Sequence, residues 1–180
     1  MILSTKGLDL TKIIKTFPDF PKSGILFRDI NPVFGDHTAM DYVSEEFCRR
    51  IPKSSIDCIV GIESRGFVIA TVLALATGKG LVLVRKAGKL PGQTLRQSYE
   101  IEYGNSTMEI QKDSIRKGQR VLIADDLVAT GGTAIAAERL VTQLGGKVIG
   151  FAFVIELASV GGSSKIRQLG YEVHSLVVYE

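Results

Sequence analysis

Apolar residues follow two different spacings along the chain, and together these predict alternating strands and helices. Short runs that are apolar throughout predict buried strands, whereas apolar residues every three or four positions predict helices. Strands are expected over 57–63, 81–85, 120–126, 147–156 and 173–179. Helices are expected over 8–15, from Asp36 to a stop at Pro52, over 66–77 before Gly78, and over 133–144 before Gly145. Continuously apolar strands that alternate with helices predict an α/β fold around a mostly parallel sheet.

Two segments interrupt this alternation. Residues 17–24 (FPDFPKSG) hold prolines and a glycine that prevent regular structure. Residues 86–107 are polar, punctuated by glycine and proline, and basic at their start, and SYEIEYG within them alternates weakly as in a β-hairpin. A loop of this length inside a compact domain is usually functional or disordered. We expect a mobile lid, with a plain surface excursion as the alternative.

Composition limits the class of protein. A chain of 180 residues with 45% hydrophobic and 23% charged residues is expected to form a single domain over 1–180. Its net charge of +3 and pI near 8.9 suit an anionic small molecule, and no basic block is long enough to predict binding to nucleic acid. The sequence shows neither a signal peptide nor a membrane span, and Cys48 and Cys58 lack metal-ligand spacing. We therefore expect a cytoplasmic protein with two reduced thiols.

Candidate chemistry lies where three predicted strands end. Open parallel sheets bind ligands at the carboxyl ends of their strands. The strands are followed there by ESRG (63–66), RKAGK (85–89) and DDLVATGGT (125–133). If the three strands are parallel, these segments converge on one edge of the sheet.

The third segment combines two carboxylates with a glycine turn that opens a helix. Exposed backbone N–H groups and the helix N-terminus could cradle a phosphate, with the hydroxyls of Thr130 and Thr133 as further donors. Asp125 and Asp126 could accept hydrogen bonds from a vicinal diol or hold a hydrated Mg²⁺. A diol and a phosphate at this separation indicate a ribose 5-phosphate. The alternative is that Asp126 only caps a turn that the glycines permit.

The other two strand ends carry cations. Arg65, Arg85, Lys86 and Lys89 are more than one phosphate requires, and a pyrophosphate group could use them through arginine forks and lysine point charges. Each of these side chains taken singly is more often a solvated surface residue. Their shared position at strand ends is the argument for a site.

Several motifs resemble one known family. VLIADDLVATGGTA (121–134) resembles the phosphoribosyl-diphosphate (PRPP) binding motif of the type I phosphoribosyltransferases. FPDFPKSGILFRDI, SRGF, RKAGKLPG and SYEIEYG are similar to segments of the adenine phosphoribosyltransferase family, and this similarity covers essentially the whole chain. The resemblance implies a type I phosphoribosyltransferase-like fold, with a mobile hairpin lid at 86–107 and a base-binding hood at 1–35.

The resemblance also implies a role for each motif. The ribose hydroxyls and 5-phosphate of PRPP would be bound by Asp125, Asp126, Ala129, Thr130, Gly131, Gly132 and Thr133. Pyrophosphate would be bound by Glu63, Ser64, Arg65, Arg85, Lys86 and Lys89, with a non-proline cis peptide in the loop and contacts that in some members cross a subunit interface. Adenine would be bound by Leu26, Phe27, Arg28 and Leu157. Without the resemblance, Phe27 would be read as a core aromatic.

The reaction implied is transfer of the 5-phosphoribosyl group from PRPP to adenine, which gives AMP and pyrophosphate. The resemblance implies a Mg²⁺ ion held mainly by PRPP, pyrophosphate and water, and a homodimer. Displacement at the ribose C1 needs no nucleophilic residue, and Glu102 of SYEIEYG matches the family's catalytic carboxylate, which handles a proton at the purine. The alternative for Glu102 is an outward residue on a hairpin.

Two other functions remain open from the sequence. One is a phosphoribosyltransferase for another purine base, namely hypoxanthine, guanine or xanthine. The other is a PRPP-binding regulator on the same fold, although no DNA-binding segment is visible. A phospho-acceptor receiver domain is excluded, because its acidic pair would come early in the chain and Asp125–Asp126 come late.

Overall fold

The chain forms two compact units. Its structure, a computed structural model, describes residues 7–101 and 104–180. The units are Met1–Glu46 and Phe47–Glu180, and helix α2 (His37–Arg50) runs across the boundary between them. Within the described part of the chain, the longest apolar helices are too short to cross a membrane.

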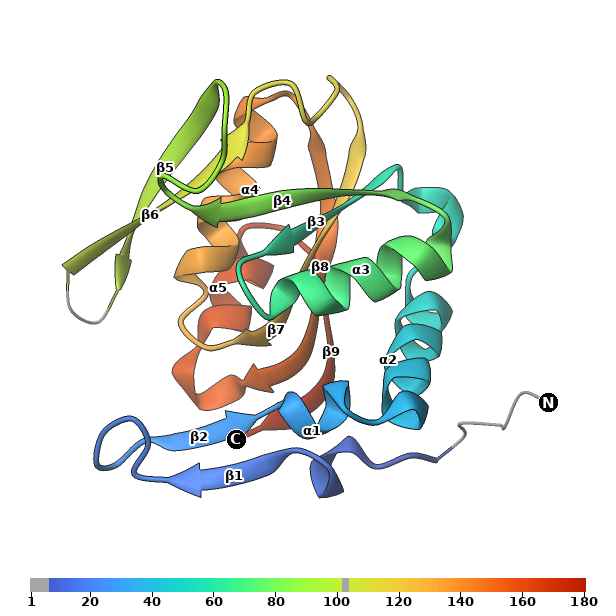
Figure 1. Cartoon of the computed structure of the whole chain (residues 1–180), viewed down its shortest axis with the longest axis vertical. Coiled ribbons are helices and arrows are strands. Elements are labelled where there is room, and N and C mark those ends of the chain that lie inside the picture. The colour runs from blue at the N-terminus through green and yellow to red at the C-terminus, as the bar shows by residue number, and fades with distance from the viewer. Residues whose placement is uncertain (1–6, 102–103) are drawn as a thin grey trace. The chain divides into compact units, whose positions relative to one another are not determined.

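Figure 1 labels the elements in chain order. The strands are β1 (Lys15–Pro18), β2 (Leu26–Asp29), β3 (Cys58–Ile62), β4 (Gly80–Lys86), β5 (Thr94–Ile101), β6 (Gly104–Gln111), β7 (Arg120–Val128), β8 (Lys147–Leu157) and β9 (Val173–Tyr179). The α-helices are α1 (Asn31–Phe34), α2, α3 (Gly66–Thr77), α4 (Gly132–Gln143) and α5 (Gly162–Gln168). Short 3-10 turns lie at Leu10–Lys12, Lys53–Ser55 and Ala158–Val160.

The first unit carries a two-stranded antiparallel sheet. β1 pairs with β2 so that Phe17 lies opposite Phe27. The turn between them contains a cis Phe20–Pro21 peptide, and the Phe20 ring meets the Phe27 ring edge-on at 5.1 Å between centroids. The helix expected over 8–15 is wrong, because only Leu10–Lys12 forms a 3-10 turn before β1 begins.

The second unit is built on a seven-stranded sheet of order β5-β6-β4-β3-β7-β8-β9. The five strands from β4 to β9 in this order are parallel, whereas β6 pairs antiparallel with both β4 and β5. The mostly parallel sheet predicted from the sequence is therefore confirmed. The hairpin expected near SYEIEYG is longer than its motif, because β5 and β6 pair from Thr94↔Gln111 to Ile101↔Gly104.

The order of the strands places helices on both faces of this sheet. The step from β3 to β4 and the step from β7 to β8 run in opposite directions along the sheet. Since crossover connections are right-handed, α3 covers one face and α4 the other, an arrangement that can be followed in Figure 1. α4 packs beneath β5, β6, β7 and β8, and α5 packs beneath β8 and β9.

The core of the second unit explains why the central strands read as apolar throughout. Every residue of β3 is buried, as are Leu122 and Ile123 of β7 and Phe151 and Phe153 of β8. A strand with helices on both of its faces has no solvent side, so its sequence need not alternate. This core fixes the carboxyl ends of the central strands, where the candidate residues lie.

Candidate active site

Three neighbouring parallel strands bring the predicted segments to one edge of the sheet. Val60 of β3 is paired with Val82 of β4 on one side and with Ile123 of β7 on the other. The segments that follow β3, β4 and β7 therefore leave the sheet at the same end, as the sequence predicted. Everything described below for these segments lies within the second unit.

The two aspartates of β7 differ in their surroundings. Asp126 is 7% exposed, and its Oδ2 lies 3.0 Å from Nε of Arg65, which comes from the turn after β3. The carboxylate of Asp125 accepts a hydrogen bond of 2.9 Å from the backbone N–H of Asp126. Burial and the adjacent charge of Asp126 raise the pKa of Asp125 well above its ordinary value, although Arg65 works in the opposite direction. The pair therefore places one carboxylate against a cation and a second in a site that favours its protonated form.

The segment after Asp126 forms a small cavity bounded by backbone. Residues 125 and 127–134 line a volume of about 130 Å³, several times the roughly 30 Å³ that a water molecule occupies in the liquid. Gly131 has φ of +80°, a left-handed conformation that side chains with a Cβ rarely adopt. α4 begins at Gly132, so its unpaired N–H groups point toward the same cavity. Ala129 through Thr133 are thus brought together as a cradle with the size and polarity for a phosphate.

Gly162, the first residue of α5, packs against the back of this cradle. Its N–H donates to the carbonyl of Ala129 at 2.9 Å. A Cβ at position 162 would overlap the Ala129 carbonyl oxygen and the Gly131 nitrogen. Sequence reasoning missed this support, because a glycine at a distant helix start carries no local sign of what approaches it.

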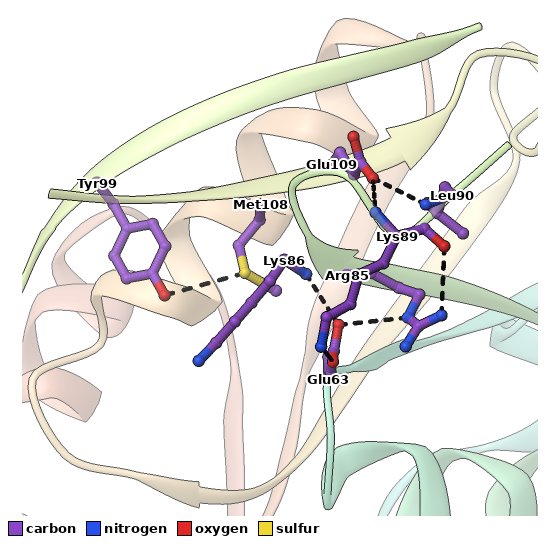
Figure 2. Close-up of polar contacts among 8 residues, drawn as sticks. All are labelled: Glu63, Arg85, Lys86, Lys89, Leu90, Tyr99, Met108 and Glu109. Atoms are coloured by element: carbon purple, nitrogen blue, oxygen red, sulfur yellow. Dashed lines mark hydrogen bonds and ion pairs between the residues drawn. The ribbon is translucent and has the colours of Figure 1, made fainter. Parts of the chain in front are cut away.

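Residues at the end of β4 and in the loop that follows it bind the carboxylate of Glu63 (Figure 2). Glu63 Oε2 accepts from Nε of Arg85 at 3.3 Å and from the backbone N–H of Lys86 at 3.0 Å, and Oε1 is bound by Nζ of Lys89. Burial would raise the pKa of Glu63, but hydrogen bonds from Lys89, Lys86 and Arg85 together lower it below its ordinary value. The charged groups of Arg85 and Lys89 therefore converge on one point, which the Glu63 carboxylate occupies, whereas Lys86 reaches it only through its backbone.

The Glu63–Ser64 peptide bond is cis, as the family resemblance implied. Ser64 is exposed, and its carbonyl accepts from the N–H of Phe67, which closes the turn into α3. Arg85 also lies over the ring of Phe67, with its guanidinium carbon 5.9 Å from the centroid. This turn sets Arg65 toward Asp126 and leaves Glu63 facing the β4 cations.

A second buried carboxylate, which the sequence analysis did not identify, lies beside this cluster. Glu109 of β6 is fully buried and accepts from the backbone N–H groups of Lys89 and Leu90 at 2.8 and 2.9 Å (Figure 2). Burial would raise the pKa of Glu109, but the backbone donors and Arg96 lower it. The sequence of β6 does not reveal this role, because a buried charge on a strand is recognisable only from its partners.

A larger cavity of about 480 Å³ adjoins the phosphate cradle. Its lining combines the hairpin, the start of α4 and α5 through the residues Ser98, Tyr99, Thr130, Gly132, Ile135, Ala136, Arg139 and Lys165. Arg139 and Lys165 are exposed and have no ion pair within the described part of the chain. Sequence reasoning missed both, since each occupies an ordinary solvent-facing helix position.

The first unit holds three of the four predicted base-binding residues, and one of them, Phe27, lines an apolar cavity. A volume of about 370 Å³ is lined by Phe17, Phe20, Phe27, Asp29 and Asn31. Leu26 is 56% exposed, and Arg28 lies next to Phe27 on β2. Phe17 and Phe20 were not predicted, although FPDFP places both within a few residues of GILFRDI.

Glu102 and Leu157 complete the set of predicted site residues. Glu102 lies outside the described residues. Leu157 ends β8, in the second unit, and is half-buried.

The polar residues also bear on the expected Mg²⁺. Within the described ranges, no cluster of three or more His, Cys, Asp or Glu side chains has the arrangement of a metal site. Mg²⁺ in phosphoryl sites is commonly held by one or two carboxylates together with substrate phosphates and water. Asp125 and Asp126 beside a phosphate cradle fit a metal that arrives with a phosphorylated ligand.

Known proteins resemble the chain over most of its length. A family model described as a phosphoribosyl transferase domain matches residues 40–174. A curated adenine phosphoribosyltransferase from Cenarchaeum symbiosum is 51% identical over 172 residues, which make up 96% of this chain and 100% of the relative. The crystal structure of the adenine phosphoribosyltransferase from Thermoanaerobacter pseudethanolicus has a TM-score of 0.90 at 44% identity and covers 94% of this chain and 98% of its own. The crystal structure of the Saccharomyces cerevisiae enzyme, complexed with adenine and an imino-altritol bisphosphate, has a TM-score of 0.88 at 43% identity. It covers 93% of this chain and 96% of its own.

Proposed function

The chain belongs to the adenine phosphoribosyltransferase family, and we propose how its residues divide the work of the reaction that this membership assigns to it. The enzyme transfers the 5-phosphoribosyl group of PRPP to adenine and gives AMP and pyrophosphate, a purine-salvage reaction. The family, fold and enzyme class expected from the sequence are confirmed. The residue roles that follow are proposals, supported by the convergence of three strand ends at one edge of the sheet.

The 5-phosphate and ribose of PRPP bind at the end of β7. Residues Ala129 through Thr133 wrap the 5-phosphate with backbone N–H groups and the two threonine hydroxyls, helped by the N-terminus of α4. Asp125 and Asp126 accept hydrogen bonds from the ribose hydroxyls. Arg65 is already paired with Asp126 and orients that carboxylate.

Pyrophosphate is bound by the basic residues at the end of β4 and in the loop that follows it. Arg85, Lys86 and Lys89 supply positive charge, and the turn at Ser64 and Arg65 supplies backbone donors. In the reaction the bond from C1 to the pyrophosphate oxygen breaks and a bond from C1 to a purine nitrogen forms. Charge that develops on the leaving group meets cations that are already in place, which lowers the barrier without a protein nucleophile.

The first unit supplies the proposed adenine site. Phe27 stacks on the purine, and Leu26 and Arg28 present backbone groups to its edge. Leu157, of the second unit, keeps the adenine-binding role that the family resemblance gives it. The apolar cavity beside Phe27, with Phe17 and Phe20 on its walls, supports the role of Phe27. Glu102 takes the proton that the purine releases as the new bond forms.

A Mg²⁺ ion bound together with PRPP would be held mainly by the phosphates and by water. When bound, it supplies positive charge against the pyrophosphate oxygens. Asp125 and Asp126 are the residues that would face it, in keeping with the small number of carboxylates that such sites use.

We also propose that the enzyme is a cytoplasmic homodimer, on the basis of family resemblance and of its two free cysteines. Light scattering on the purified protein would report the dimer, and cell fractionation would report the compartment. A monomeric mass at micromolar concentration would contradict the first of these proposals.

A substrate screen tests the function most directly. Purified enzyme with PRPP and Mg²⁺ is offered adenine, hypoxanthine, guanine, xanthine or uric acid, and nucleotide and pyrophosphate are quantified. We expect AMP and pyrophosphate in equal amounts from adenine, with the other bases converted far more slowly. Faster conversion of another base, or adenine left intact while PRPP binds, would point to one of the two alternatives.

A further inference from the structure

Glu109 is a buried charge that the proposed chemistry does not use. Its side chain is fully buried on β6. Burying a carboxylate costs several kcal/mol unless its oxygens are well bound, and a buried apolar residue at the same position would avoid that cost. What Glu109 binds therefore indicates why a charge stands there.

Among the described residues, the donors to Glu109 come from the loop between β4 and β5 or from the strand that follows it. Oε1 accepts from the backbone N–H groups of Lys89 and Leu90, and Oε2 accepts from Thr94 Oγ1 at 3.3 Å and Arg96 Nε at 3.1 Å. The loop is a tight, glycine-punctuated segment, since Gly88 and Gly92 both have positive φ. Glu109 thus ties the loop to the sheet at one point.

Lys89 is held through three of its groups by this arrangement (Figure 2). Its N–H donates to Glu109, its carbonyl accepts from Nη1 of Arg85 at 3.3 Å, and its Nζ binds Glu63. Arg85 in turn reaches Glu63 through Nε. One backbone position therefore sets the direction of both cations, and Glu109 fixes that position from the buried side.

We infer that Glu109 is a positioning residue for pyrophosphate, which holds the Lys89 backbone so that Lys89 and Arg85 point at the pyrophosphate site. The inference rests on the proposed roles of these two cations. Glu109 contacts neither cationic head group, so its effect passes through the loop backbone. It should influence pyrophosphate more than any ligand of the β7 cradle.

The test compares two ligands in the Glu109→Gln variant. Glutamine keeps the shape but puts an amide N–H₂ where one of the two oxygens now accepts. Calorimetry with pyrophosphate in the presence of Mg²⁺ should show a loss of affinity of roughly tenfold, the size expected for hydrogen bonds to a charged group. Affinity for ribose 5-phosphate, which lacks the pyrophosphate, should stay within about twofold, as should the KM for adenine. Equal loss for both ligands, or none for pyrophosphate, would overturn the inference.

A matched control separates positioning from stability. Asp57 also binds an arginine and a backbone N–H, through Arg120, but it lies before β3 at the opposite edge of the sheet. Asp57→Asn should lower the melting temperature while leaving pyrophosphate affinity unchanged. If both variants weaken pyrophosphate binding in proportion to their loss of stability, the role of Glu109 is only structural.

A double-mutant cycle tests whether Glu109 acts through Lys89. In the Lys89→Ala background, Glu109→Gln should cause much less further loss of pyrophosphate affinity than in the wild type, because the group it positions is gone. Full additivity would contradict the inference. If Glu109→Gln does not fold, Glu109→Asp takes its place: it keeps the charge but cannot reach every donor, so pyrophosphate alone should bind more weakly.

Pyrophosphate binding by the wild type distinguishes a failure of the proposed function from a failure of the positioning role. A wild-type enzyme that binds no pyrophosphate would remove the proposed role of Arg85 and Lys89. A wild type that binds pyrophosphate, with Glu109→Gln unchanged, would remove only the positioning role.

Discussion

Asp125 is the residue at which binding and stability place opposite demands on one side chain. Burial and the charge of Asp126 raise the pKa of Asp125 well above 3.8, so the folded chain binds this proton more tightly than the unfolded chain does. The free energy of unfolding therefore falls as pH rises from about 3.8 through the raised pKa. Asn cannot ionise, yet its side-chain oxygen can still accept from the Asp126 N–H. Asp125→Asn should melt at a higher temperature than the wild type at pH 8, with the difference shrinking toward pH 4, and should bind ribose 5-phosphate more weakly.

Thermal unfolding followed at several pH values measures this effect, with ribose 5-phosphate affinity as the second readout. An Asn variant that is less stable than the wild type at pH 8 would show that the ionised carboxylate stabilises the fold. The expected trade of stability for binding is common where a charged group is kept for function.

Glu102 carries the proposed proton transfer, and a single atom change tests it. Glu102→Gln keeps the size of the side chain but removes the base, so kcat for AMP formation should fall by roughly 10²-fold or more. PRPP affinity should change little, because Glu102 is assigned to the purine side. Steady-state kinetics and PRPP calorimetry measure the two quantities. Near-normal turnover would remove Glu102 from its role.

At the scale of elements, the fit between α5 and the phosphate cradle is the most restrictive contact. A Cβ at Gly162 would meet backbone atoms of residues 129 and 131, which cannot move aside without distorting the cradle. Gly162→Ala should cost about 1–3 kcal/mol of stability and should weaken ribose 5-phosphate binding by roughly tenfold or more. Gly80→Ala is the matched control, because a Cβ there would meet nothing within 4 Å. Denaturant unfolding and calorimetry on both variants test the contact, and equal behaviour of the two would contradict it.

The elements also show what a sequence can and cannot specify. β3 and β7 were predictable because strands buried on both faces leave long apolar runs. The acidic and glycine-rich segment at the end of β7 was predictable because its unusual residue types stand close together in the sequence. β1 was not predictable, because all four of its residues are exposed and its sequence therefore shows no buried face. The strand depends on its pairing with β2. Gly162 and Glu109 were missed for a related reason: their significance lies in residues far away in sequence, which only the fold brings near.

At the scale of the whole molecule, charge should guide PRPP toward the site. The chain carries a net charge of +3, and Arg139 and Lys165 add two cations to the large cavity beside the phosphate cradle. PRPP is strongly anionic, and a cleft of one sign of charge raises the association rate of such a ligand. These two residues are not assigned to the reacting groups, so they should act on approach and not on chemistry.

Replacing both residues therefore separates steering from catalysis. Arg139→Gln combined with Lys165→Gln should lower kcat/KM for PRPP by roughly threefold to tenfold at low ionic strength, with kcat unchanged. The difference should narrow as salt is added, because screening shortens the reach of these charges to about 10 Å at 0.1 M. Arg116→Gln with Lys117→Gln removes the same charge before β7, at the opposite edge of the sheet, and should have a much smaller effect. If the two double variants lose kcat/KM equally, net charge alone attracts PRPP, whereas a salt-independent loss would mean that Arg139 or Lys165 contacts the bound substrate.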